Sequence, residues 1–255
     1  LPSNYISLQE LNNKFNVSQE LEDNYRKINQ NFGKFNESKV VVTYIDRFIR
    51  LKIFPLAAAA YGSDKNINEC LTEIYPDFLF IKSWVVKCQG VDAYCSAFTA
   101  VSLTDEAIVL AFRGTDTFWQ LTHEVLETLL LQKVLSVFGH GYITGHSLGG
   151  SLAALAAAKL VHIKAIPQER IKLVTFGQPR TGDSVFAAGM DRELSFFNYR
   201  VVRARDLVVH VPPRTYEDYA HYKTEIFYDN DMKPGSNWKR CVGGDEDKDC
   251  ANKYE

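Results

Sequence analysis

The stretch YITGHSLGGSLAALAAAKLV (residues 142–161) decides the fold. A short apolar segment, YITG, runs directly into a helix of small residues, and Gly145, Ser147 and Gly149 form a G-x-S-x-G motif at the junction. A strand that turns this sharply into a helix needs glycine on both sides of the serine, because a side chain there would collide with neighbouring backbone. We therefore predict that Ser147 stands at the N-terminus of the helix, with its Oγ lifted out of the sheet.

This position suits a nucleophile. The helix dipole and the backbone N–H of Leu148 can stabilise an oxyanion that develops beside Ser147. A second N–H donor is expected from the loop after an earlier strand. The strand-like run AIVLAF (107–112) leads into RGTD (113–116), which offers the N–H and hydroxyl of Thr115. The same Thr-Asp pair also suits the N-cap of a following helix, and both roles can hold at once.

A serine nucleophile needs a base, and the base needs a carboxylate that orients it. In proteins with this motif the order along the chain is serine, acid, histidine. Asp206 closes the strand-like run YRVVRARD and is the preferred acid. Asp183 is the rival, but it precedes an apolar helical run and is better explained as an N-cap. His210 and His221 both follow Asp206, so both satisfy the order of the chain.

Strand-like and helix-like segments alternate along the rest of the chain. This alternation predicts an α/β fold, with a mostly parallel central sheet and helices on both faces. Residues 1–40 are polar and hold eight Asn, so we predict an N-terminal extension that is partly disordered, followed by one domain over 41–255. The strand-like segments are FLFIKSWVVKC (78–88), AYCSAFTAVS (93–102), AIVLAF, RIKLVTF (170–176), FFNYRVVR (196–203) and HYKTEIFYDN (221–230), and YIDRFIRLKIFPLAAAAYG (44–62) reads as a helix interrupted by Pro55.

Composition excludes two classes of function. The 255 residues carry 29 Lys and Arg against 31 Asp and Glu, and this near balance argues against a nucleic-acid-binding protein, which would show a basic patch. No apolar run reaches the roughly 18–20 residues that a transmembrane span needs. With 46% apolar residues the chain can bury a large core, so a globular protein is predicted. The residues do not indicate an oligomeric state.

The five cysteines suggest an oxidising compartment. Two short local bridges fit their spacing, and one cysteine is left without a mate; five free thiols in a reducing cytosol are the alternative. Two Asn-x-Ser sequons favour the secretory route, so a secreted, extracellular protein is predicted. His and Cys show no metal-ligand spacing, so neither a metal nor a cofactor is expected. The two bridges would be Cys88–Cys95 and Cys241–Cys250, and the remaining thiol is Cys70.

Taken together and in order, these motifs resemble those of the class 3 lipases, the filamentous-fungal type of α/β-hydrolase, and especially their nematode-like animal members. The resemblance implies an α/β-hydrolase domain that hydrolyses lipid esters, by default acylglycerols, at a lipid–water interface. It also implies that Ser147 is the nucleophile, Asp206 the triad acid, and Thr115 and Leu148 the oxyanion donors. The motifs are PLAAAAYG (55–62), FRGTD (112–116), TGHSLGG (144–150), LVTFGQPRTGD (173–183), YRVVRARDLVVHVPP (199–213), HYKTEIFYD (221–229) and the Cys241/Cys250 pair.

The sequence departs from this family at the histidine. The resemblance places the catalytic histidine, and a last cysteine that pairs with an early one, beyond the local cysteine pair, but the sequence stops at Glu255. We therefore expect a chain cut short, which would explain the unpaired Cys70. His221 is the fallback base, although in the family this position is structural, as is that of His210. His146 should point elsewhere because of the elbow geometry. A catalytically inactive lipase-like protein that binds lipid or a partner is the alternative function.

A second departure lies between the RGTD loop and the serine motif. The family places a short lid and then a crossover helix there, whereas this chain shows one helical segment, FWQLTHEVLETLLLQKVL (118–135). One helix can supply the crossover that parallel strands need. We expect it to supply that crossover and, if it stays mobile, to face the lipid.

Overall fold

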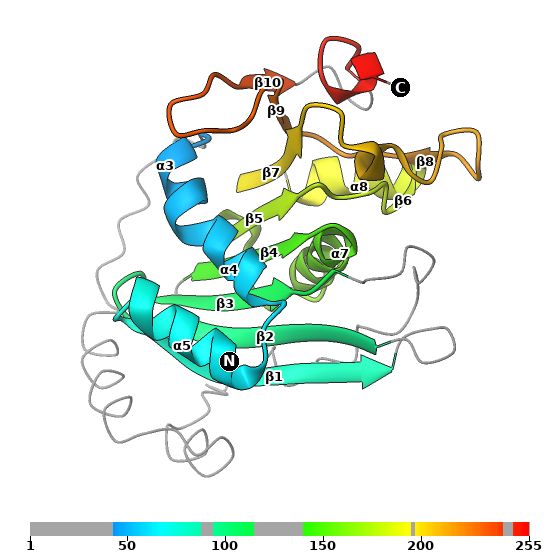
Figure 1. Ribbon diagram of the computed structural model, residues 1–255. Coiled ribbons are helices and arrows are strands. Elements are labelled where there is room, and N and C mark those ends of the chain that lie inside the picture. Colours follow the sequence, from blue (N-terminus) through cyan, green and yellow to red (C-terminus); the bar gives the residue numbers. More distant parts are fainter. Residues whose placement is uncertain (1–42, 88–93, 115–139, 195–196, 242–246, 255) are drawn as a thin grey trace.

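The computed structural model describes residues 43–87, 94–114, 140–194, 197–241 and 247–254 (Figure 1). Its centre is an eight-stranded sheet in the order β1-β2-β3-β4-β5-β7-β9-β10. The predicted extension over 1–40 and the predicted helix over 118–135 lie outside the described residues. The strands of this sheet are β1 (Phe78–Lys87), β2 (Tyr94–Ser102), β3 (Ala107–Phe112), β4 (His140–His146), β5 (Ile171–Phe176), β7 (Phe197–Arg203), β9 (Glu225–Tyr228) and β10 (Lys239–Cys241); β6 (Gly182–Asp183) and β8 (Tyr219–Ala220) form a separate pair.

The middle of the sheet is parallel. Strands β3, β4, β5, β7 and β9 pair in parallel, while β1 and β2 on one side and β10 on the other pair antiparallel. The predicted mostly parallel sheet is therefore confirmed. Because parallel strands end at the same edge, the loops after β3, β4, β5 and β7 meet there. These loops begin with Arg113, Ser147, Gly177 and Ala204.

Helices cover both faces of the sheet, as predicted (Figure 1). Strand β3 is buried throughout, and its side chains alternate between the two layers. Ile108 and Leu110 pack toward α7, whereas Val109 and Ala111 pack toward α4 and α5. On the face of Val109 and Ala111 lie α3 (Asp46–Phe48), η1 (Ile49–Ile53), α4 (Phe54–Ala59) and α5 (Asp64–Ile74). On the face of Ile108 and Leu110 lie α7 (Leu148–His162) and α8 (Ser184–Glu193). The short helices η2 (Gln168–Arg170), η3 (Leu207–His210) and η4 (Ala251–Tyr254) lie between strands or at the end of the described chain.

Pro55 interrupts the hydrogen bonds of the first helical run but not its path. The run continues from α3 through the π-helical segment η1 into α4, with Pro55 at the start of α4. Proline has no N–H, so the carbonyl of Leu51 loses its usual helical donor. The Tyr75 hydroxyl donates to that carbonyl and lies 3.1 Å from the carbonyl of Lys52. The interruption predicted at Pro55 is therefore a local change of hydrogen bonding. Tyr75, the C-cap of α5, supplies the donor that the proline lacks.

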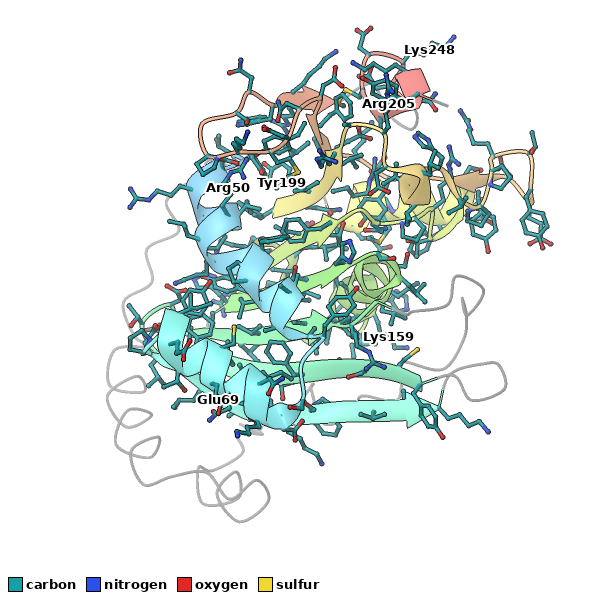
Figure 2. All side chains as sticks on the ribbon, viewed as in Figure 1. Arg50, Glu69, Lys159, Tyr199, Arg205 and Lys248 are labelled. Carbon is teal, nitrogen blue, oxygen red and sulfur yellow. A yellow bond between two sulfur atoms is a disulfide. The ribbon has the colours of Figure 1, made fainter. Side chains whose placement is uncertain are left out.

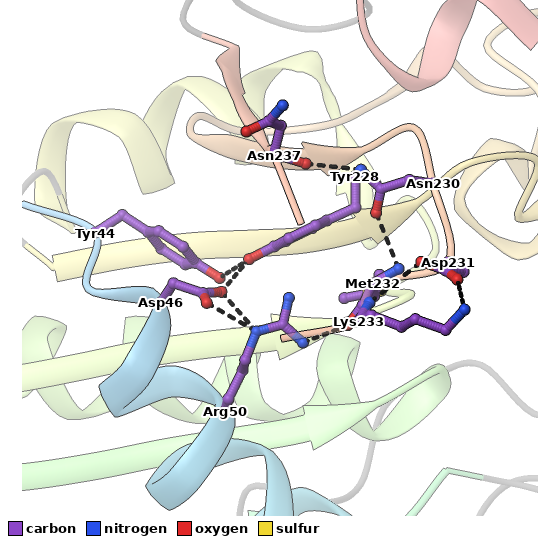
Figure 3. Close-up of polar contacts among 9 residues, drawn as sticks. All are labelled: Tyr44, Asp46, Arg50, Tyr228, Asn230, Asp231, Met232, Lys233 and Asn237. Atoms are coloured by element: carbon purple, nitrogen blue, oxygen red, sulfur yellow. Dashed lines mark hydrogen bonds and ion pairs between the residues drawn. The ribbon is translucent and has the colours of Figure 1, made fainter. Parts of the chain in front are cut away.

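A cluster of polar contacts fixes the start of this helix to the sheet (Figure 3). The Asp46 carboxylate accepts two hydrogen bonds from Arg50 Nε, at 2.9 and 2.8 Å, and one from the Tyr228 hydroxyl of β9. Tyr44 and Tyr228 share a hydrogen bond of 3.0 Å between their hydroxyls, and the ring of Tyr44 packs edge-on against Tyr199 of β7. The helix is thus anchored over β7 and β9.

The last strands are held by a disulfide and a buried ion pair. Cys241 of β10 is bonded to Cys250, which confirms that predicted bridge. Arg200 of β7 lies opposite Glu225 of β9, with 3.6 Å between Nη2 and Oε2, and both side chains are nearly buried. Glu225 also accepts a hydrogen bond of 3.0 Å from the N–H of Ala251. These contacts attach η4 to the sheet.

Candidate active site

The G-x-S-x-G motif forms the sharp turn that the sequence predicts. Ser147 follows β4 and precedes α7 with φ 57° and ψ −131°, in the left-handed half of conformational space that residues with a Cβ rarely adopt. A Cβ on Gly145 would lie 2.8 Å from the N of Gly150 and still closer to the carbonyl of Gly149. A Cβ on Gly149 would lie 2.8 Å from the N of Gly114. Both glycines are therefore required by close backbone contacts.

We expect Gly149→Ala to lower the free energy of unfolding by about 3 kcal/mol, because its Cβ would overlap backbone atoms of the loop after β3, which cannot move aside cheaply. Urea denaturation followed by circular dichroism measures this. The matched control is Gly189→Ala in α8, where a new Cβ would have its nearest contact at 4.0 Å, with the Arg192 side chain. That change should be neutral or stabilising, as at an open helical position. Equal losses of unfolding free energy in Gly149→Ala and Gly189→Ala would contradict the requirement for glycine at position 149.

Ser147 lies at the N-terminus of α7, directly beside the loop after β3. Leu148, the first residue of the helix, is buried. A Cβ on Gly114 would stand 3.2 Å from Cβ of Ser147 and 2.7 Å from the carbonyl of His146. The loop therefore passes against the serine. Thr115, the next residue, lies outside the described residues, and its role as the second oxyanion donor stays a prediction.

Asp206 is placed at the same edge by the loop after β7. It caps η3, with its Oδ1 accepting a hydrogen bond of 3.0 Å from the N–H of Val208. Its Oδ2 reaches over Gly177, where a Cβ would lie only 2.7 Å away. Gly177 has φ 53° and follows β5, so glycine is required there both for conformation and for space. Sequence reasoning missed this role of Gly177, which its position after a strand could have suggested.

The rival carboxylate has the role that the sequence favoured. Asp183 is the N-cap of α8, and its Oδ1 accepts a hydrogen bond of 2.8 Å from the N–H of Phe186. The interpretation of Asp183 as a cap is therefore confirmed.

A buried arginine holds the loop that carries Asp206. Arg180 has no exposed surface, and its Nη1 donates to the carbonyls of His210 and Pro212, the latter at 2.9 Å. Its own backbone N–H donates to the carbonyl of Val211 at 2.9 Å. Three contacts from one residue thus fix the chain just after η3. An arginine in the loop directly after a buried strand was the available signal, and the sequence reasoning did not use it.

His146 lies nearer to the acid than the sequence suggested. Its Nδ1 is 2.9 Å from the Tyr61 hydroxyl, and its Nε2 is 3.7 Å from the point where a Cβ on Gly177 would be, the same point that Asp206 Oδ2 approaches. Surrounding protein lowers the pKa of His146 by desolvating the imidazolium, and the Asp206 carboxylate acts in the opposite direction. The Asp206 carboxylate therefore acts electrostatically on His146, although His146 is next to the nucleophile in sequence.

His221, the fallback base, packs against the backbone of η3, the short helix that Asp206 caps. It is buried, and its Nε2 lies 2.8 Å from the carbonyl of Val209 in η3, a contact in which the nitrogen is the donor. Burial, followed by the charge of Arg200, holds the pKa of His221 well below its usual range. These contacts describe a neutral histidine that supports η3. A role for His221 as the base stays a prediction, and nothing in this geometry supports it.

The buried neutral state of His221 predicts a pH dependence of stability. The folded protein keeps the ring neutral, whereas the unfolded chain protonates it below a pH of about 6.5. The contribution of the neutral ring to the free energy of unfolding is therefore complete above that pH. It is lost as the pH falls below that value, by about 1.4 kcal/mol per pH unit for one proton. We expect His221→Gln, whose amide N–H can still reach Val209, to lose this part of the slope in urea titrations between pH 5 and 7. His162→Gln, at an exposed histidine, should leave the slope unchanged; parallel slopes for the wild type and His221→Gln would contradict the prediction.

The other cysteines agree with the predicted framework as far as the structure describes them. Cys95 is disulfide-bonded, while Cys88 lies outside the described residues, so the pairing Cys88–Cys95 stays a prediction. Cys70 on α5 is a free thiol, as expected, and burial raises its pKa, with a contribution from Glu73.

An open pocket of about 590 Å³ adjoins Asp206. Arg205, labelled in Figure 2, lies on its wall and stacks over the ring of Tyr254 in η4, with 5.3 Å between the guanidinium carbon and the ring centre. The acid therefore borders open space on one side, and a side chain from elsewhere in the protein has room to approach it.

Comparison with known proteins points to one family. A family model described as Lipase (class 3) matches residues 140–216, which include the serine motif and Asp206. The chain is 29% identical over 280 residues to Lipase ZK262.3 of Caenorhabditis elegans, an alignment that covers 88% of this chain and 78% of that protein. It is 36% identical over 112 residues to a lipase of Rhizopus niveus, covering 43% of this chain but 27% of that protein.

Solved structures show the same fold. The lipase from Rhizopus microsporus var. chinensis superposes with a TM-score of 0.67 at 24% identity and covers 86% of each chain. Lipase II from Rhizopus niveus superposes with a TM-score of 0.68 at 23% identity, covering 84% of this chain and 92% of that one. At this identity the likeness establishes the shared fold.

Proposed function

We propose that this chain, which is similar to class 3 lipases, hydrolyses the carboxylic ester bonds of lipids, with Ser147 as the nucleophile. One observation carries the proposal: Ser147 stands in a strained conformation at the N-terminus of α7, at the sheet edge where the Asp206 loop ends. A strained serine at such a turn is held for chemistry, since the strain has no structural benefit of its own.

The chemistry follows from these positions. Ser147 Oγ attacks the ester carbonyl carbon while a histidine base takes its proton, and the carbonyl oxygen becomes an oxyanion. The N–H of Leu148, and in the proposal that of Thr115, donate to this oxygen. The tetrahedral intermediate collapses, the alcohol leaves with the proton from the base, and an acyl group stays on Ser147. Water, activated by the same base, then releases the fatty acid.

Asp206 orients the base in this scheme. Its Oδ1 is held by the Val208 N–H, which leaves Oδ2 for a histidine N–H. The resemblance assigns that histidine to none of the described residues, and the open pocket beside Asp206 offers it an approach. Asp206 and Ser147 are therefore the proposed acid and nucleophile, whereas His146, His210 and His221 are not proposed as the base.

Acylglycerols are the proposed substrates, and the extracellular space is the proposed location. A match to a protein named as a secreted mono- and diacylglycerol lipase, from Malassezia restricta, supports both. The Cys241–Cys250 disulfide is in keeping with an oxidising compartment. Among the helices that the structure describes, none has the length and apolarity to cross a membrane.

Titration of released fatty acid tests the proposed function. The purified protein is given emulsified tributyrin, emulsified triolein and a phosphatidylcholine dispersion at constant pH, and the products are identified by mass spectrometry. We expect acid release from the acylglycerols. Binding to the emulsions without release of acid from any of these esters would contradict the proposal and favour a protein that binds lipid without turnover.

A further inference from the structure

The β1–β2 hairpin projects past the strands that carry the catalytic loops (Figure 1). Phe112, the last residue of β3, pairs with Ala97 of β2. Both strands of the hairpin continue beyond that pair, with Tyr94 of β2 opposite Lys87 of β1. The N–H of Arg113 still bonds the carbonyl of Ser96, at 2.8 Å. The end of the hairpin therefore stands at the same sheet edge as Ser147.

Large apolar side chains gather at this end and face solvent. Val85 is 64% exposed, Tyr94 51% and Val86 42%, although most apolar side chains of the sheet are buried. Residues opposite each other in an antiparallel pair point to the same face. Because Val85 lies two positions before Lys87, and Lys87 is opposite Tyr94, these three share one face, while Val86 points to the other.

The hairpin over 78–102 carries two Lys and one acidic residue, Asp92 between its strands, so its charge is net basic. Lys82 and Lys87 are the charged residues of the two described strands, and Arg113 donates a hydrogen bond of 3.4 Å to the carbonyl of Tyr94. The exposed apolar residue Ile74 at the end of α5 differs, since Glu73 precedes it and Asp64 and Glu69 lie on the same helix. An apolar tip with a net basic charge complements an anionic lipid surface, to which lysine is attracted electrostatically.

We propose that the end of the β1–β2 hairpin, formed by Val85, Val86, Lys87 and Tyr94, docks the protein on an anionic lipid surface. This inference rests on the proposed function, since it adds how the lipid is reached. Val85 and Val86 enter the boundary of the acyl chains, Tyr94 keeps its hydroxyl among the headgroups, and Lys87 and Arg113 face the phosphates. The docked hairpin brings the catalytic edge of the sheet against the lipid.

Vesicle co-sedimentation tests this docking without any need for turnover. The Ser147→Ala protein is mixed with vesicles of phosphatidylcholine and phosphatidylglycerol at 7:3, and with phosphatidylcholine alone. The hairpin variant adds Val85→Ser and Tyr94→Ser, both at exposed positions where substitution should leave the fold intact. The matched control adds Ile74→Ser, which removes an exposed apolar side chain (46% exposed) at the opposite edge of the sheet. Circular dichroism checks that all three proteins are folded.

We expect the parent to bind the phosphatidylglycerol vesicles more tightly than phosphatidylcholine alone, and less tightly in high salt. The hairpin variant should partition about tenfold less, and the Ile74→Ser control should stay within about twofold of the parent. Equal binding of hairpin variant and parent, an equal loss from Ile74→Ser, or no vesicle binding by the parent would overturn the proposal. Failure of the proposed function would appear separately, as an absence of fatty acid release by the protein with Ser147 intact.

Discussion

Replacing Ser147 by alanine is expected to lower the rate of ester hydrolysis by at least about 10³-fold, because the acyl-enzyme can no longer form and only oxyanion stabilisation and binding remain. The measurement is kcat/KM for a short-chain aryl ester in solution, where lipid docking plays no part. Circular dichroism and urea denaturation establish that the variant is folded.

The control is another serine of the same helix. Ser151 lies one turn beyond the motif, is fully buried, and accepts a hydrogen bond of 3.0 Å from the Thr181 hydroxyl. Ser151→Ala therefore tests whether loss of any hydroxyl from α7 reduces the rate. It should lose stability but keep most of the activity. Activity of Ser147→Ala within tenfold of the wild type would rule Ser147 out as the nucleophile.

Asp206→Asn is expected to lower kcat/KM by roughly 10³- to 10⁴-fold, since an amide cannot stabilise the imidazolium and favours the wrong tautomer of the base. Asparagine keeps the cap, because its amide oxygen can still accept from the Val208 N–H, so the unfolding free energy should change by less than about 1 kcal/mol. The two effects are measured separately, by ester kinetics and by urea denaturation.

Asp183→Asn provides the matched control for this second prediction. Asp183 caps α8 in the same way that Asp206 caps η3, with a hydrogen bond of 2.8 Å to the Phe186 N–H. If Asp206 is only a cap, the two variants should behave alike. If it is the triad acid, only Asp206→Asn loses activity. A retained activity above about one tenth in Asp206→Asn would show that the acid lies elsewhere.

The sequence predicted the elements whose signals are local. The elbow could be foreseen because its glycines, its strand and its small-residue helix are adjacent, and the structure shows Ser147 at φ 57° at that junction. Asp206 could be placed after a strand because the run that forms β7 is rich in aromatic and β-branched residues. The capping role of Asp183 followed in the same way from its place before a helix.

Contacts between distant segments could not be foreseen from the sequence. Tyr61 and His146 are 85 positions apart, and they meet because α4 lies across the sheet with its end above β4. Arg180 reaches the carbonyls of the loop after Asp206 for the same reason, since β5 and β7 are neighbours in the sheet. Only the order of the strands brings these residues together.

The central claim is that Ser147 is an activated nucleophile, and covalent labelling tests it most directly. The protein is incubated with a fluorophosphonate, digested, and the modified peptide is identified by mass spectrometry, with Ser147→Ala treated in parallel. We expect one adduct, on the peptide that contains Ser147, and none on the corresponding peptide of the variant. An adduct on another serine, or no adduct on a protein that circular dichroism shows to be folded, would contradict it.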